Sequence, residues 1–171
     1  MKKGLTRNKN PVFIARMRTK TFGLILALCF LTAGACFASP QLGTWKLNPA
    51  KSKTGRGIGR NNTVVYEWAF PLRYRVEIDG IDAKGKAFHS QWVGDFDGKD
   101  YPVSGDATSD ARAYSKVNDN TLNFTIKKGG KVTATGRIVV AADGKTRTVT
   151  SWSRDSKGKR ITIRAIYNKA S

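Results

Sequence analysis

The chain has 171 residues, of which 31 are lysine or arginine and 12 are aspartate or glutamate, so its net charge is +19. It contains one histidine and two cysteines, Cys29 and Cys36. This composition leaves too little material for a histidine-based metal site, a Ser-His-Asp triad or a disulfide scaffold. The chain is therefore expected to be neither an enzyme of these classes nor a metal protein, and no cofactor is expected.

Residues 1–38 predict a secretory signal peptide. They contain seven basic and no acidic residues, and an apolar run over 22–31 is followed by small residues. A basic start, a short apolar run and a small-residue exit are the parts of such a signal. The run is shorter than the roughly 20 residues that a spanning helix needs. Met17 stands directly before Arg-Thr-Lys and the apolar run, so a start at Met17 is an alternative.

Two cleavage sites compete at the end of this segment. Cleavage after Ala38 gives a soluble protein exported to the periplasm or the outside. Cleavage after Ala35 leaves Cys36 first and raises the alternative of a lipid anchor. Ala33 stands where a lipoprotein signal usually has leucine, which favours soluble export.

Residues 39–171 are expected to form one domain and to be monomeric. About 130 residues bury roughly two-thirds of their unfolded surface, which is enough for a core without disulfides. This part keeps 24 basic and 12 acidic residues, a net charge of +12, which attracts anionic surfaces. The basic residues are spread over the whole domain, and together with export this argues against a nucleic-acid partner.

A period of two in the apolar residues predicts nine or ten short strands after residue 39. The expected strands are 43–48, 63–70, 72–79, 86–93, 99–103, 111–117 and four more between 120 and 170. Turn signals at 128–130, 143–144 and 157–158 separate these last four, and such short turns require antiparallel pairing of consecutive strands. We therefore predict an all-β antiparallel meander that closes into a barrel or a strongly bent sheet. Arg73, Arg75 and Glu77 on its outward face argue against a membrane-spanning barrel.

Gly43-Thr44-Trp45 in the first strand and Arg164 in the last resemble the calycin pattern of lipocalins and fatty-acid-binding proteins. The resemblance implies a lipocalin-like barrel in which Gly43, Trp45 and Arg164 close one end, with Arg164 packed across Trp45. Residues 42–53, 97–105 and 136–150 also resemble recurring phrases of small exported bacterial proteins of unknown function. That second resemblance implies fold and export but no activity.

The inward faces of the predicted strands supply a candidate ligand site. Its members are Tyr66, Trp68, Tyr74, Ser90, Trp92 and Tyr167, with Arg147, Ser151 and Ser153 as further polar contacts. Aromatic walls with a few polar groups are typical of small-molecule sites, although a solid core is the alternative for a small barrel. The sequence therefore predicts a binding protein for a small apolar or amphipathic molecule. The alternative is a cationic interaction protein that binds an anionic polymer or lipid surface of the cell envelope.

The loop over 49–62 is rich in glycine and carries Lys51, Lys53, Arg56 and Arg60. Its G-x-G-x-G run lacks the following helix that a phosphate-binding loop needs. We expect this loop to be the most mobile part of residues 39–171. If the barrel takes a ligand, the loop is the candidate gate and its cations favour anionic head groups, but a solvated loop without a gating role is the preferred alternative. His89 is expected to face solvent. The aspartates between 95 and 110 are expected to serve turns, since Asp and Gly are common turn residues.

Overall fold

The computed structural model describes residues 39–55, 58–155 and 157–170. The predicted signal peptide, with Met17 and Cys36, lies outside the described residues, and so does Arg56 of the loop. Within the described residues no helix is long and apolar enough to cross a membrane.

The described residues form ten β-strands and one turn of 3-10 helix. These are β1 (Gly43–Leu47), η1 (Pro49–Lys51), β2 (Arg60–Ala69), β3 (Arg73–Ile81), β4 (Ala87–Gly94), β5 (Tyr101–Ser104), β6 (Ala111–Asn118), β7 (Thr121–Lys128), β8 (Lys131–Val140), β9 (Thr146–Arg154) and β10 (Arg160–Lys169).

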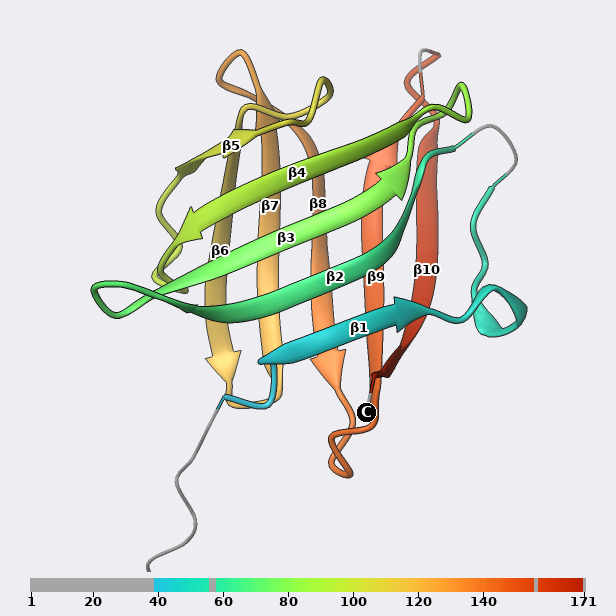
Figure 1. Cartoon of the computed structure of the whole chain (residues 1–171). Helices are drawn as coiled ribbons and strands as arrows, with labels where there is room; N and C mark the ends of the chain where they lie inside the picture. Colours follow the sequence, from blue (N-terminus) through green and yellow to red (C-terminus); the bar gives the residue numbers. More distant parts are fainter. Residues whose placement is uncertain (1–38, 56–57, 156, 171) are drawn as a thin grey trace, which may run out of the picture. The chain divides into compact units, whose positions relative to one another are not determined.

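Each strand pairs antiparallel with the next one, and β1 pairs with both β2 and β10, so the sheet closes into a barrel (Figure 1). The predicted all-β meander is confirmed. The hairpin turns of the second half contain Gly129, Gly130, Gly144 and Gly158, all with positive φ, a conformation that glycine adopts without steric cost. The glycine signals of the sequence therefore lie at the reversals that set the strand order.

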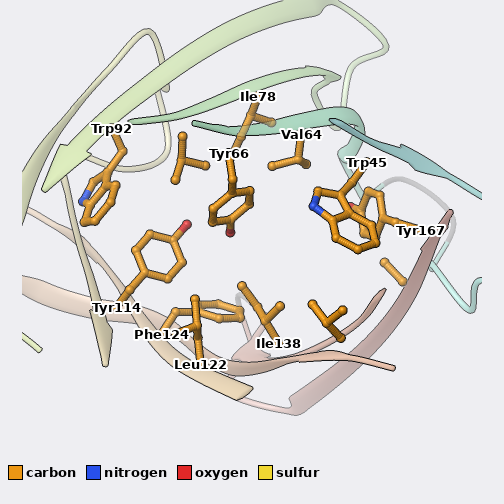
Figure 2. Packing of buried hydrophobic residues seen from close by; sticks show 13 residues of the cluster. Trp45, Val64, Tyr66, Ile78, Trp92, Tyr114, Leu122, Phe124, Ile138 and Tyr167 are labelled. Atoms are coloured by element: carbon orange, nitrogen blue, oxygen red, sulfur yellow. The ribbon is translucent and has the colours of Figure 1, made fainter. Parts of the chain in front are cut away.

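Alternate side chains of the strands point into the barrel and form one apolar core. Its buried members are Trp45, Val64, Tyr66, Val76, Ile78, Trp92, Tyr114, Leu122, Phe124, Ile138, Val140, Ala165 and Tyr167. In Figure 2, Tyr66 and Ile78 from one wall face Tyr114, Phe124 and Ile138 from the opposite wall across the interior. The core is thus built by residues far apart in the sequence, which meet because the sheet closes.

The boundaries of β2 and β3 differ from the predicted strands 63–70 and 72–79. β2 begins at Arg60, three residues earlier than expected, because Arg60 and Asn61 already pair with Ile81 and Gly80 of β3. Leu72 is the first residue of the predicted strand 72–79, and its alternation with Tyr74 predicts an inward side chain. In the structure Leu72 lies in the turn before β3 and is 87% exposed. The loop after β1 also begins with the turn η1, in which the Asn48 side chain accepts a hydrogen bond from the Lys51 amide.

Candidate ligand cavity

The barrel interior contains a cavity of about 230 Å³. Apolar side chains such as Val64, Ile78, Phe124 and Ile138 form most of its wall. The polar lining consists of Thr54, Arg60, Asn61, Tyr66, Arg112, Tyr114, Arg147, Ser151, Ser153 and Tyr167. The interior is therefore not a solid core, and its wall combines apolar surface with a few polar groups, as small-molecule sites do.

A second hollow of about 780 Å³ adjoins this cavity. It lies where the β3–β4 turn, the β5–β6 loop and the start of β2 meet, and Phe88, Lys86 and Ala107 are among its lining residues. Gly59, Asn61 and Arg112 line both hollows. We call the second hollow the mouth, because it shares lining residues with the interior cavity and is bordered by surface loops.

Arg147 on β9 is the main charged group in the wall. It is 2% exposed, and its guanidinium carbon lies 4.7 Å from the ring centre of Tyr66, 5.1 Å from that of Tyr167 and 5.4 Å from that of Trp45. Within the described part of the chain no carboxylate forms an ion pair with it. Its Nε and Nη1 also lack hydrogen-bond partners there.

Burying such a cation costs several kcal/mol when no anion accompanies it. The three ring faces offset part of this cost, at about 0.5–2 kcal/mol for each cation–π contact. Ring faces do not replace the directional acceptors that guanidinium N–H groups prefer. An anionic oxygen placed in the cavity beside Arg147 would supply both the missing charge and the missing acceptors.

The two tyrosines beside Arg147 are held in their neutral form. Burial raises the pKa of Tyr66 above its ordinary value, and the neighbouring Tyr114 adds to the rise while Arg147 opposes it. Burial likewise raises the pKa of Tyr167 against the opposing effect of Arg147. The Tyr167 hydroxyl donates a hydrogen bond to the Asn61 carbonyl at 3.2 Å. Both side chains can therefore act as neutral hydroxyl groups next to the cation.

Arg112, the other buried arginine, is already neutralised. Its Nη2 lies 2.6 Å from Asp106 Oδ2, and the two side chains are only 7% and 11% exposed. Burial works against the charge, but Tyr114 and Asp106 more than compensate and raise the pKa of Arg112. This ion pair ties the β5–β6 loop to β6 at the border between the cavity and the mouth. Arg112 therefore has a structural role, whereas Arg147 has no carboxylate partner in the described part of the chain.

The structure brings only part of the predicted ligand set together. Tyr66 and Tyr167 line the cavity, as do Arg147, Ser151 and Ser153. The remaining predicted members, Trp68, Tyr74, Ser90 and Trp92, do not line it.

These four side chains have other positions. Trp92 is buried and donates its indole N–H to the Arg112 carbonyl at 3.0 Å. Ser90 is buried as well. Tyr74 is stacked on Trp68, with ring centres 4.4 Å apart, and Trp68 is 54% exposed. The prediction for Trp68 as a cavity residue is wrong, because alternation along β2 fixes its face but not whether the barrel still encloses that part of the strand.

The predicted closure of one barrel end packs Arg164 across Trp45, but the structure does not bring these two residues together. Trp45 is fully buried and its indole N–H donates to the Gln41 carbonyl at 2.9 Å. Arg164 is exposed, because its neighbour Ala165 and then Tyr167 are the residues of β10 that point inward. The cations over the Trp45 ring are Arg147 and Lys169.

Gly43 has a definite role next to Trp45. Its φ is +114°, and a Cβ at this position would lie 2.8 Å from the Lys169 side chain. The absence of a side chain at Gly43 therefore leaves room for Lys169 to reach across to the Trp45 ring, where its Nζ lies 5.3 Å from the ring centre.

The predicted gate loop is divided in two. Its first part is fixed to β10, where the Ile166 amide donates to Ser52 Oγ at 2.9 Å and the Lys53 amide donates to the Arg164 carbonyl at 2.7 Å. Lys51 and Lys53 are exposed there and do not line the cavity. Thr54 and Arg60 do line it. Gating by this loop stays a prediction, and of the loop's described cations only Arg60 borders the cavity.

The remaining expectations concern polar residues outside the cavity. His89 is exposed and its Nδ1 lies 2.8 Å from Asp79 Oδ1, so the predicted orientation toward solvent is confirmed. In turns, Asp97 accepts a hydrogen bond from the backbone amide of Lys99, and Asp106 accepts one from that of Thr108. Over the described ranges no group of three or more His, Cys, Asp or Glu side chains could hold a metal ion.

Arg112 is a cavity-lining residue that the sequence pattern did not single out. The faces of the predicted strand 111–117 were left unassigned, although Arg112 and Tyr114 alternate with period two and both point into the barrel. A charged residue at an inward position of a strand was the signal that could have found it.

Comparisons with known proteins add little to this geometry. No family model matches the chain, and no curated protein matches it in sequence. Among solved structures, a redesigned β-barrel, mFAP1, bound to DFHBI, is similar with 15% sequence identity and a TM-score of 0.42. The match covers 76% of this chain and 95% of that chain. A similarity this low carries no argument about the ligand or the function of this protein.

Proposed function

We propose that this protein is an exported, non-enzymatic, lipocalin-like binding protein that encloses a small amphipathic molecule with an anionic group. The observation that carries the proposal is Arg147, a buried guanidinium that faces the cavity and has no carboxylate partner among the described residues. The anionic group of the ligand would lie against Arg147, and its apolar part would lie against Val64, Ile78 and Ile138.

The energetics favour an anion at this place. Hydrogen bonds between a guanidinium and an anionic oxygen are about twice as strong as neutral ones, and the apolar wall strengthens them by excluding water. Arg147 is buried in the ligand-free barrel, so much of the cost of desolvating it has been met during folding. The hydroxyls of Tyr66 and Tyr167 and the side chain of Ser151 are further polar groups of the same cavity.

The composition of the cavity wall supports the non-enzymatic part of the proposal. The described lining of the inner cavity contains no aspartate, glutamate, histidine, cysteine or lysine. The serine and tyrosine hydroxyls of the lining would need an adjacent general base to become nucleophiles, and the groups that most often act as that base are absent from this described lining. Export is proposed from the signal-peptide features of residues 1–38, and soluble release after Ala38 is preferred to a lipid anchor on Cys36.

A matched pair of fluorescent probes tests the proposal. 8-Anilinonaphthalene-1-sulfonate carries a sulfonate, and N-phenyl-1-naphthylamine is the same aromatic system without it. The wild-type protein should bind the sulfonate probe at least ten-fold more tightly than the neutral probe. Arg147→Met should remove most of this preference while it leaves binding of the neutral probe unchanged, because only the charge contact is lost.

Arg164→Met is the matched control, since Arg164 lies on the neighbouring strand and is exposed. This variant should keep the wild-type preference for the sulfonate. Equal loss in the two variants would mean that diffuse surface charge attracts the probe, and the proposal would be rejected. Native mass spectrometry of protein purified from its own host should show a co-purified small molecule that is absent or reduced in Arg147→Met.

A further inference from the structure

The tip of the β2–β3 hairpin exposes a continuous apolar surface. Phe70 is 98% exposed, Leu72 87% and Trp68 54%, and residues 68–72 carry no charge. In Figure 1 this hairpin extends sideways beyond the neighbouring strands. We call these five residues the hairpin tip. Contiguous exposed apolar side chains of this kind mark interaction surfaces more often than scattered single ones do.

A stack of aromatic rings connects Trp68 of the hairpin tip to the core. The ring of Trp68 stacks on Tyr74 at 4.4 Å, and Tyr74 stacks on Phe96 at 3.9 Å. Phe96 in turn lies parallel to the buried Trp92, with ring centres 6.3 Å apart. The stack connects the tip to the core, so Phe70 and Leu72 are presented on a supported hairpin and little ordering is required when they bind.

Leu72 occupies a backbone position that suits glycine better. Its φ is +65°, and it is the one non-glycine residue with positive φ in the described ranges. A Cβ disfavours this left-handed conformation. An exposed leucine at such a position gains nothing for the turn itself, which points to a contact made by its side chain.

We propose that the hairpin tip inserts into the surface of an anionic lipid bilayer. A second copy of the chain is the weaker alternative, because a stable interface buries about 800 Å² on each partner. Three side chains fall short of this even when they are fully covered, since a large aromatic residue buries about 150–250 Å². A lipid bilayer can take up a few apolar side chains at its interface without a large contact area. Tryptophan, phenylalanine and leucine are the residues that commonly insert there.

The charge of the protein selects anionic lipid over neutral lipid. Glu67 is the only acidic residue between 60 and 76, and Arg75 neutralises it at 3.0 Å. Arg73 follows the hairpin tip directly and is exposed. Residues 39–171 carry +12 in total, which draws the domain toward negatively charged headgroups before the tip makes contact. The inference does not depend on a ligand in the barrel.

Vesicle flotation tests the inference with the purified exported protein, from which residues 1–38 have been removed, because their apolar run and seven basic residues would bind anionic vesicles by themselves. Phosphatidylcholine vesicles with and without 30 mol% phosphatidylglycerol are compared at low and high salt. Wild type should bind the anionic vesicles and bind the neutral ones much less. Phe70→Ser combined with Leu72→Ser should weaken binding to the anionic vesicles at least ten-fold. Val132→Ser combined with Val139→Ser removes two exposed apolar side chains elsewhere and should bind like wild type.

Circular dichroism melting of each double variant checks the fold, and a tip variant that melts like wild type makes the comparison direct. Wild-type binding by the tip variant would overturn the proposal, since charge alone would then account for the attraction. Failure of wild type to float with anionic vesicles would overturn it as well. Two further results would overturn the proposal, provided that vesicle binding persists in the tip variant. One is concentration-dependent dimerisation that the tip substitutions abolish, and the other is retention on an anionic polysaccharide that they abolish.

Discussion

The guanidinium carbon of Arg147 lies 4.7 Å from the ring centre of Tyr66, and no carboxylate in the described part of the chain neutralises it. A buried arginine normally forms an ion pair, as Arg112 does with Asp106 in the same barrel. Arg112 is therefore a structural cation, and Arg147 is a cation that is available to a ligand. This difference leads to opposite expectations for their removal.

Arg147→Met should leave the ligand-free protein at least as stable as wild type. The substitution removes the desolvation cost of an unpaired charge, which amounts to several kcal/mol, and loses cation–π contacts of about 0.5–2 kcal/mol each. Urea unfolding followed by far-UV circular dichroism measures the change. A loss of more than about 2 kcal/mol in the free energy of unfolding would mean that Arg147 has a structural partner.

Asp106→Asn should destabilise the protein by about 3–5 kcal/mol, because it leaves Arg112 buried without its anion. The same unfolding experiment measures this change. Asp143→Asn is the matched control, since Asp143 is exposed and accepts only a turn amide from Lys145. Its cost should stay below about 1 kcal/mol, as for other surface sites. Equal effects of the two substitutions would contradict the assignment of Asp106.

Trp45→Ala should cost about 3–5 kcal/mol, as other buried aromatic residues do when they are cut to alanine. A double-mutant cycle with Arg147→Met should show a coupling of about 0.5–2 kcal/mol from the cation–π contact. The same cycle with Arg164→Met should show none, because Arg164 is exposed on the outer face. Coupling between Trp45 and Arg164 in place of Arg147 would contradict this prediction and support the contact between Arg164 and Trp45 that the calycin resemblance implies.

The two tyrosines of the cavity predict a loss of stability at alkaline pH. Burial raises the pKa of Tyr66 and Tyr167 in the folded protein, whereas tyrosine in the unfolded chain ionises near pH 10. The unfolded state therefore releases these protons first. The stabilisation is complete below pH 10 and is lost as the pH rises toward the folded-state pKa values.

Absorbance at 295 nm, followed together with circular dichroism, tests this expectation. Tyr66 and Tyr167 should ionise only as the protein unfolds, and Tyr66→Phe with Tyr167→Phe should flatten the fall in melting temperature above pH 10. Ionisation of all five tyrosines in the folded state near pH 10 would show that water reaches the barrel interior and would contradict this prediction.

The fold was largely predictable from the sequence, because its determinants are local. Period-two alternation identified the strands, and glycine pairs such as Gly129-Gly130 marked the reversals. The need to hide one apolar face predicted a barrel or a strongly bent sheet, and the pairing of β1 with β10 shows that the sheet is a closed barrel. Small shifts, such as the start of β2 at Arg60, arose because cross-strand pairing extends a strand through residues of low strand propensity.

The site was less predictable, because it depends on contacts between distant strands. Alternation placed Arg147 inside, but only the assembled register shows that no acidic residue faces it. The same rule failed for Trp68, since it does not say how far along β2 the barrel remains closed. It could not show that the Trp45 ring meets Arg147 and Lys169 in place of Arg164.

The pairing of β1 with β10 has a consequence for how the chain folds. Trp45 is opposite Lys169 in this pairing, so the last hydrogen-bonded seam joins residues more than a hundred positions apart. Contacts of such long range slow the folding of small domains. A nascent chain cannot close the barrel before its final strand is available, and it stays open for longer than a chain whose contacts are local. For a protein that we propose to be exported, this delay would keep the polypeptide competent to cross a membrane before its core forms.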